Sequence, residues 1–397
     1  MAVDLRALPD KQTLPGSPVK GRWYVVILLC AVLGAALISL LWPEHIPQMT
    51  LWYWACVVVV PLTSGLLLFA LRHLIYERQY DYVQSWNLSR NEQEQVLIQD
   101  GQRRVAMLAT SYCTAAGSNQ LAQALRNGSK PLQPVFLEQS EITLRVSQLT
   151  PAAQVHTAQE YSARLKAHFH QVMGGLDKEL QQFVRTAPLY VRIKHNQILS
   201  DGDVLSLWEE YAQARLTVDQ VDIADDDGLL WLDAWLDKPE SNALYLSLEI
   251  NLFQEPIAEH AESVSAVLLA QAHWCASEKR EPLAWIHRPV LMTRGAESVH
   301  DVLLWGRIHD GDAAPFVWQS QVPGDQLGEA SIAMSTAGHP LEHDRCLSLD
   351  DSLGLPGKAV GNLALVIAAE HARAEQQPQL VMLQDATLQW GVVRPAG

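Results

Sequence analysis

The stretch that decides the fold lies near the end of the chain: KAVGNLALVIAAEHARAEQ (358–376), followed by QLVMLQDATLQWGVV (379–393). The first segment is a strongly apolar run rich in small residues, which is typical of a helix that packs deep against a sheet. The second segment predicts two strands joined by a turn near Asp385 and Ala386. Together they predict a domain built from both helices and strands.

Segments further upstream alternate between strand and helix in the same way. Predicted strands lie at 104–112, 141–149 and 243–253, and predicted helices lie at 118–128, 156–185 and 261–274. This alternation predicts the α/β class with a mostly parallel, covered sheet. A boundary near residue 240 divides the region into 101–240 and 241–397, each of a common domain size.

Two apolar runs precede the α/β region. WYVVILLCAVLGAALISLLW (23–42) and LWYWACVVVVPLTSGLLLFAL (51–71) contain no Asp, Glu, Lys, Arg or His. A helix of twenty residues is about 30 Å long, which matches the hydrocarbon core of a bilayer. We therefore predict a hairpin of two transmembrane helices, preceded by a disordered tail (1–22) and followed by a helical connector (72–100).

The charges that flank the two runs predict the orientation of the hairpin. The short link PEHIPQMT (43–50) contains no Lys or Arg. The basic residues lie on the outer flanks, at Arg6, Lys11, Lys20, Arg22, Arg72 and Arg78. The positive-inside rule then predicts a multi-pass protein of the cell inner membrane, with both termini and the main domain in the cytoplasm. Five scattered cysteines without a CxxC motif agree with a reducing compartment.

The net charge restricts the classes of partner. The formal charge of −15 lies almost wholly beyond residue 85, so the main domain is acidic. Such a domain is repelled by phosphate backbones, which disfavours nucleic acid and favours protein partners. The histidines are scattered and no glycine-rich phosphate loop follows a predicted strand. We predict no metal and no cofactor.

The segment IADDDGLLWLDAWLD (223–237) is the strongest local charge feature. Its aspartate spacing resembles part of a calcium loop, but Ile223 and Ala234 occupy the first and twelfth ligand positions. A solvated acidic turn before an amphipathic helix fits the segment better than a calcium site.

Two tryptophans follow the acidic turn. Because they lie four residues apart, they share one face of the predicted helix. They either pack in the core or form part of a protein-docking surface. The candidate docking patch consists of Asp225, Asp226, Asp227, Trp231 and Trp235.

Cys113 is the one candidate nucleophile. It lies in TSYCTAAGSNQLAQAL (110–125), between a predicted strand and a predicted helix, where a thiol pKa is lowered. Condensing enzymes of the thiolase group use a strand–Cys–helix arrangement with two His or Asn partners, and His339 and Asn362 are candidates for these. A second spacing, from His339 to Asp344, resembles one that some acyltransferases use. The alternative function is therefore a membrane-bound, thiolase-type acyl-transfer enzyme using Cys113.

The usual catalytic signatures GxSxG, GxxxxGK[ST], HExxH and GxGxxG are missing, which favours a binding role over catalysis. The chain resembles the type VI secretion lipase-adaptor family in its apolar pair and in RRVAMLATSYCTAAGSNQLAQALRNG (103–128), EITLRVSQL (141–149) and GNLALVIAAEHARAEQQPQLVML (361–383). The resemblance implies a two-part α/β protein without enzymatic activity, whose partners are a phospholipase-type effector and a spike or carrier protein. The main prediction is thus a non-enzymatic adaptor or chaperone, tethered at the membrane, that recruits the effector to the secretion machinery.

Overall fold

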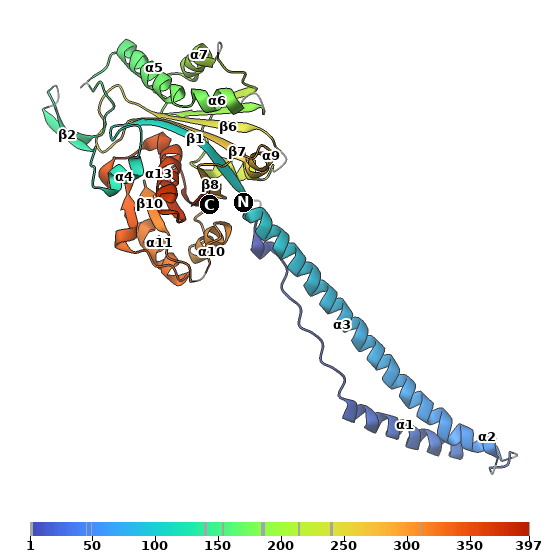
Figure 1. Cartoon of the computed structure of the whole chain (residues 1–397). Coiled ribbons are helices and arrows are strands. Elements are labelled where there is room, and N and C mark those ends of the chain that lie inside the picture. The colour runs from blue at the N-terminus through green and yellow to red at the C-terminus, as the bar shows by residue number, and fades with distance from the viewer. Residues whose placement is uncertain are drawn as a thin grey trace. The chain divides into compact units, whose positions relative to one another are not determined.

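The structure is a computed structural model of the chain that describes residues 3–44, 46–48, 50–138, 141–152, 155–183, 187–212, 215–238, 241–309 and 311–396. The chain divides into two compact units (Figure 1). One unit is Asp4–Leu97, and the other is Ile98–Gly397 together with Met1–Val3. The first unit is helical and the second is α/β.

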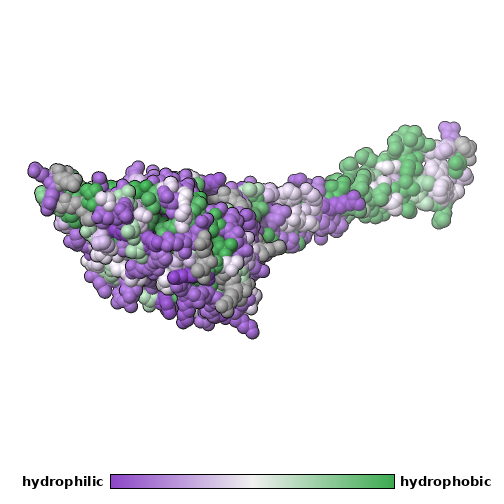
Figure 2. Space-filling model, turned by 90° about the horizontal axis from the view of Figure 1, so that it is seen from above, coloured by the Kyte–Doolittle hydropathy of each residue, from purple (hydrophilic) through white to green (hydrophobic). Residues whose placement is uncertain are grey.

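The helical unit contains two helices that are long and apolar enough to cross a membrane. They are α1 (Lys20–Leu40) and a continuous helical stretch made of α2 (Leu51–Trp54), the π-helical turn η2 (Ala55–Val59) and α3 (Val60–Gly101). Figure 2 shows an apolar surface over part of this unit, with polar stretches on either side of it, and a largely hydrophilic surface on the α/β unit. The sequence prediction of two such helices is confirmed at this level.

The two helices of the hairpin cross closely because glycines lie at the contact points. A Cβ atom placed on Gly34 would lie 2.5 Å from the Cβ of Pro61. One placed on Gly65 would lie 3.1 Å from the Cα of Ile27. Small residues at such crossings let helix backbones approach each other within a membrane.

The N-terminal segment lies along α3, where the sequence had predicted a disordered tail. A 3-10 turn, η1 (Leu5–Ala7), opens the segment. The backbone N–H of Gln12 donates to Asn87 Oδ1 and the Asn87 amide donates back to the Gln12 carbonyl, both at 2.9 Å. Arg90 donates to the carbonyl of Pro9 at 3.2 Å. Polar side chains of the helix therefore supply partners for the backbone of this segment.

Among the described residues, eleven strands of the α/β unit form one mixed sheet in the order β11–β10–β12–β13–β8–β1–β7–β6–β4–β5, with β9 pairing to β13. Their bounds are β1 (Arg104–Thr114), β4 (Leu189–His195), β5 (Gln220–Ile223), β6 (Leu244–Asn251), β7 (Ser263–Gln271), β8 (Ala284–His287), β9 (Val290–Leu291), β10 (Phe316–Ser320), β11 (Cys346–Ser348), β12 (Gln379–Gln384) and β13 (Leu388–Pro395). A separate hairpin pairs β2 (Gln133–Leu137) with β3 (Ile142–Val146).

The helices of this unit are mostly short. They are α4 (Leu121–Arg126), α5 (Ala158–Gly174), α6 (Asp177–Phe183), α7 (Asp201–Ala212), α8 (Leu230–Leu236), α9 (Ala272–Ser277), α10 (Ala296–Trp305), α11 (Gly324–Thr336), α12 (Leu349–Ser352) and α13 (Val360–Glu375), with 3-10 turns η3 (His343–Arg345) and η4 (Gly357–Ala359). The start of α5 shows why such a helix begins where it does. Thr157 and Glu160 form a capping box that satisfies its first backbone N–H groups.

The sheet contains the same unit twice. The strands β5–β4–β6–β7 and β11–β10–β12–β13 have the same order, and in each set three strands are parallel and the fourth is antiparallel. Helices α7 and α8 connect the first set, and α11 and α13 occupy the equivalent connections of the second. The sequence shows no repeat that corresponds to this duplication.

Helix α13 forms the centre of the α/β unit. Figure 1 shows α5, α6 and α7 over one face of the strands around β6 and β7, with α4 and α13 on the other face and β10 and α11 beyond them. The buried face of α13 packs against strands of both repeats, as its small apolar sequence predicts. The two hydrophobic cores therefore lie on opposite faces of the β6–β7 part of the sheet.

Three details differ from the sequence prediction, although the α/β class itself is confirmed. The segment 261–274 was predicted as a helix, but most of it is strand β7, buried throughout between β1 and β6. A fully buried apolar run has no polar face, so its periodicity cannot distinguish helix from strand. The sheet is mixed and not mostly parallel. It also runs unbroken across the predicted boundary near residue 240, because β4 pairs directly with β6.

Candidate functional site

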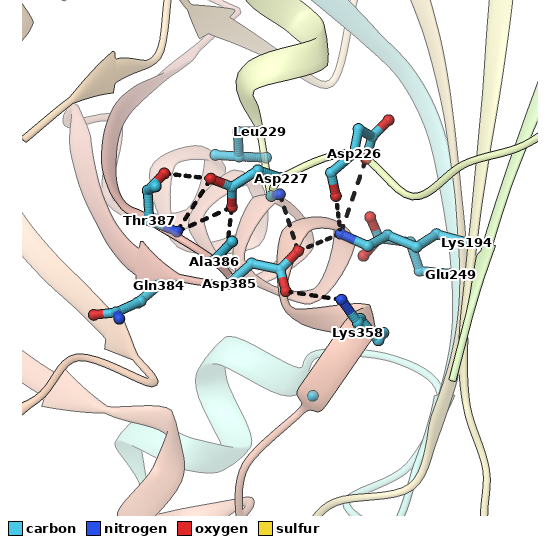
Figure 3. A network of polar contacts seen from close by, with 12 residues as sticks. Lys194, Asp226, Asp227, Leu229, Glu249, Lys358, Gln384, Asp385, Ala386 and Thr387 are labelled. Carbon is cyan, nitrogen blue, oxygen red and sulfur yellow. Dashed lines mark hydrogen bonds and ion pairs between the residues drawn. The ribbon is translucent and has the colours of Figure 1, made fainter. Parts of the chain in front are cut away.

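The three aspartates of the predicted docking patch lie in different environments. Asp225 is exposed. Asp226 accepts hydrogen bonds from the buried guanidinium of Arg192, with Nε–Oδ2 at 2.7 Å. Asp227 accepts from the backbone N–H groups of Ala386 at 2.9 Å and Thr387 at 3.1 Å (Figure 3). Two of the three carboxylates therefore hold parts of the same unit together.

The two tryptophans of the patch pack inside the unit. Trp235 is 4% exposed, and its ring lies 4.5 Å from that of Tyr245 on β6. Trp231 stacks on Trp235 at 6.3 Å, and the Arg192 guanidinium lies 4.9 Å from the Trp231 ring. This is the core-packing alternative that the sequence left open. Binding of a protein partner by these residues stays an untested prediction, as do the predicted effector and spike partners.

Cys113 is not placed as a nucleophile. It lies within β1 in the same hydrophobic cluster as Leu248, and burial raises the pKa of its thiol to about 11. Asn362 accepts a hydrogen bond from the hydroxyl of Ser247 at 2.9 Å. Ser247 and Leu248 are neighbours on β6, so their side chains point to opposite faces of the sheet. The sheet therefore separates Cys113 from Asn362, and His339 follows the outer helix α11.

A buried ionic network lies where the two repeats meet (Figure 3). The Lys194 side chain, 2% exposed, donates to the carboxylate of Asp385 and, at 2.6 Å, to the backbone carbonyl of Asp226. Asp385 also accepts from the backbone N–H of Gly228 at 3.1 Å, and Lys358 Nζ lies 3.6 Å from its other oxygen. Burial opposes ionisation of Asp385, but the two lysines and the Gly228 N–H outweigh it and lower the pKa of this carboxyl.

The carboxylate of Glu249, a residue of β6, lies at the N-terminus of α13. It accepts from the backbone N–H of Asn362 at 2.7 Å and from Arg192 at 3.1 Å. Complete burial raises the pKa of Glu249 despite these donors. A helix N-terminus favours an anion, and here a side chain of the same unit supplies it.

An open cleft of about 580 Å³ adjoins this network. It lies at the carboxyl ends of the neighbouring parallel strands β10 and β12, the edge of a parallel sheet where ligands commonly bind. Its lining residues come from the loops after these strands and from the segment before α13: Gln321, Val322, Pro323, Asp350, Leu355, Gly357, Lys358, Gln384 and Asp385. The cleft is the candidate active site.

Asp350 is the candidate acid–base group of the cleft. Its two oxygens accept from the Ser320 hydroxyl at 2.8 Å and from the Gln321 backbone N–H at 2.6 Å. Burial raises the pKa of this carboxyl above its ordinary value. A raised pKa brings a carboxylate closer to the range in which it can accept a proton from a weakly acidic group. Lys358 lines the same cleft and offers a cation for developing negative charge.

Asp350, Gln321 and Lys358 were not predicted as site residues from the sequence. One sequence feature could have indicated these residues. Polar residues that directly follow buried strands gather at one edge of a parallel sheet, where ligands bind. That signal required β10 and β12 to be recognised as neighbours, and 58 residues separate them in the chain. Within the described part of the chain, no group of three or more His, Cys, Asp or Glu side chains is placed to hold a metal ion.

No family model and no curated protein matches the chain. Solved structures match its fold. A chain in the complex of a type II polyketide synthase acyl-carrier protein with its ketosynthase, bound to the hexaketide, is 7% identical, with a TM-score of 0.52 over 74% of this chain and 99% of that chain. A beta-ketoacyl synthase from Burkholderia phymatum STM815 is 11% identical, with a TM-score of 0.52 over 74% and 99% of the two chains.

A third similar structure is the ketosynthase from module 1 of the bacillaene synthase from Bacillus amyloliquefaciens FZB42. It is 10% identical, with a TM-score of 0.51 over 74% of this chain and 76% of that chain. The α/β unit therefore has the thiolase-like fold of ketosynthases, as the sequence analysis allowed.

These similarities correct the main functional prediction. The resemblance to the type VI secretion lipase-adaptor family was wrong, because the solved structures that match this fold are ketosynthases and a beta-ketoacyl synthase. The prediction of a non-enzymatic adaptor or chaperone rested on that resemblance and on missing motifs.

Proposed function

We propose that this protein is a membrane-anchored enzyme that transfers acyl groups, with the cleft at the ends of β10 and β12 as its active site. The observation that carries the proposal is the meeting of Asp350 and Lys358 in one open cleft of a thiolase-like fold. Fold similarity alone does not define an activity, so the proposal depends on these two residues.

None of the described residues that line the cleft carries a thiol, which favours direct transfer over a cysteine-linked intermediate. The donor is an acyl thioester, and the acceptor carries a hydroxyl or amine. Asp350 removes a proton from the acceptor as its oxygen or nitrogen forms a bond to the acyl carbon. The ammonium of Lys358 stabilises the negative charge on the carbonyl oxygen. The carbon–sulfur bond then breaks, and the leaving thiolate takes the proton from Asp350.

We further propose that the two apolar helices anchor the enzyme in the cell inner membrane, with both termini and the α/β unit in the cytoplasm. The basic outer flanks and the uncharged link between the helices support this orientation.

The test uses the purified full chain in lipid nanodiscs with acyl-coenzyme A donors and a panel of hydroxyl and amine acceptors. Release of free thiol reports transfer. We expect Asp350→Asn to lower the rate about 100-fold or more, because the base is lost. Asp351→Asn is the matched control, since the neighbouring carboxyl is exposed and its loss leaves the base in place.

Cys113→Ser distinguishes the two acyl-transfer mechanisms. Direct transfer leaves the rate of this variant near that of the wild type, whereas a cysteine mechanism abolishes it. The proposal fails if the wild type releases no thiol with any acceptor, or if Asp350→Asn and Asp351→Asn behave alike.

A further inference from the structure

Gln321 has a backbone conformation that few residues other than glycine adopt. It directly follows the last residue of β10 and has φ of 59°, in the left-handed region. A residue other than glycine is held there only when its surroundings fix it, and such residues gather at functional sites. Gln321 lines the cleft.

The side chain of Gln321 joins the segments that line the cleft. Its Oε1 accepts from the backbone N–H of Gly357 at 2.9 Å. Its Nε2 donates to the backbone carbonyl of Gln384 at 2.8 Å and to that of Gly357 at 3.3 Å. One amide therefore connects the loop after β10, the turn before α13 and the end of β12.

The backbone of Gln321 holds the proposed base. Its N–H donates to Asp350 Oδ2 at 2.6 Å, while the Ser320 hydroxyl donates to Oδ1 at 2.8 Å. The left-handed conformation directs this N–H toward Asp350 while the side chain reaches Gly357. Lys358 directly follows Gly357, so Gln321 contacts Asp350 and the residue beside Lys358.

We infer that Gln321 is a positioning residue that fixes the separation of Asp350 and Lys358 across the cleft. This inference rests on the proposed function and identifies the residue that aligns its two reacting groups. In this arrangement the side chain of Gln321 hydrogen-bonds to backbone groups, and the backbone N–H of Gln321 holds the Asp350 carboxylate without taking part in the proton transfer. Loss of the Gln321 side chain removes the hydrogen bonds to Gly357 and Gln384. The loop after β10 is then free to move, and its backbone N–H no longer holds the Asp350 carboxylate in place.

The surroundings of Asp350 define the expected pH dependence. Asp351 on the same helix disfavours its ionisation, and Lys358 and Asp385 line the same cleft. The Ser320 hydroxyl and the Gln321 N–H favour the ionised form. Gln321→Ala keeps the backbone N–H but frees the loop that directs it at Asp350. The weakened contact raises the pKa of Asp350, and the acid limb of the rate profile moves to higher pH.

The experiment compares Gln321→Ala, Gln321→Glu and Gln120→Gly in the full chain. We expect Gln321→Ala to lower kcat about 10- to 100-fold with a smaller change in KM, and to shift the acid limb upward. Gln321→Glu keeps the acceptor for the Gly357 N–H and should restore part of the rate. Gln120 also has left-handed φ, at 52°, but is exposed outside the cleft, so Gln120→Gly relaxes a similar backbone without changing kcat.

A second readout separates this inference from the proposed function. A carbon-13 NMR titration of labelled aspartate reports the pKa of Asp350 whether or not the enzyme is active. An unchanged titration and rate profile in Gln321→Ala would overturn the positioning role. A wild type without transfer activity, but with the expected NMR shift, would overturn the proposed function and leave the contact established.

Discussion

At the scale of single residues, three adjacent aspartates show that one residue type can have different structural roles. Asp225, Asp226 and Asp227 have the same side chain and the same local sequence context. One faces solvent, one pairs with a buried arginine and one accepts from the β12–β13 turn. Their different partners are 34 to 160 residues away in the chain. The sequence therefore could not assign their roles.

The first prediction contrasts two of these aspartates. Asp227→Ala removes the acceptor of the Ala386 and Thr387 backbone N–H groups, so we expect the free energy of unfolding to fall by about 1–3 kcal/mol. Asp225→Ala changes an exposed side chain, and its effect should stay within about 0.5 kcal/mol. Denaturant titration followed by tryptophan fluorescence measures both, and equal losses would contradict the assignment of Asp227.

The second prediction concerns the buried pair of Lys194 and Asp385. Lys194→Met leaves the carboxylate without its main partner, which should cost about 3–5 kcal/mol near neutral pH. The pKa of Asp385 is lowered in the folded unit, so its contribution to stability is present above its unfolded pKa of about 3.9. That contribution is lost as the pH falls through the lower, folded pKa.

Stability measurements between pH 6 and acid conditions test the pair. The wild type should lose this part of its stability on acidification, whereas Lys194→Met should show a shallower decline from a lower starting value. Lys358→Met is the control, because its side chain is half-exposed and lies 3.6 Å from Asp385. A Lys194→Met variant as stable as Lys358→Met would show that the pair is not structural.

At the scale of elements, the end of α5 allows a sharp comparison between two adjacent glycines. A Cβ atom on Gly174 would meet nothing within 4 Å, whereas one on Gly175 would lie 2.4 Å from Ser111 Oγ. Gly174→Ala should therefore raise the free energy of unfolding by about 0.4–1 kcal/mol, because it restricts the unfolded chain. Gly175→Ala should lower it by about 1–3 kcal/mol, because the added Cβ crowds the Ser111 side chain on β1, which must shift.

Thermal unfolding of the two variants decides this comparison. The melting temperature should rise for Gly174→Ala and fall for Gly175→Ala, and shifts of the same sign would mean that α5 does not approach β1 so closely. The double variant Gly175→Ala with Ser111→Gly is the control. It removes the crowded side chain and should recover most of the loss.

The elements could be predicted from the sequence where local pattern and environment agree. The small-residue run at 358–376 became α13, and the two strands after it became β12 and β13. The apolar runs became α1 and the start of the second long helix. Prediction failed for β7, whose burial on all sides removed the polar positions that mark a strand. The cleft could not be predicted from the sequence, because strand order is set by long-range pairing and no local pattern indicates it.

At the scale of the whole molecule, the division into two units predicts that they can be produced separately. A chain that starts at Ile98 retains both hydrophobic cores and all strands of the large sheet. We expect this fragment to remain in the supernatant after ultracentrifugation and to melt within a few degrees of the full chain. The full chain should instead stay with the membrane pellet after carbonate extraction, because two apolar helices hold it there.

Separate measurements test the two halves of this expectation. Circular dichroism of the fragment should retain the helix and strand content of the α/β unit. An aggregated fragment would show that the helical unit is required for folding. Release of the full chain by carbonate would show that its apolar helices do not span the bilayer.

The continuity of the sheet has a thermodynamic consequence. Two repeats of similar topology would unfold in two steps if each were an independent folding unit. Here β13, β8, β1 and β7 join them by an unbroken ladder of backbone hydrogen bonds, and α13 packs on both. Neither repeat can lose its order without exposing the strands and the core of the other. Calorimetry of the Ile98 fragment should therefore record a single cooperative transition, with equal calorimetric and van't Hoff enthalpies.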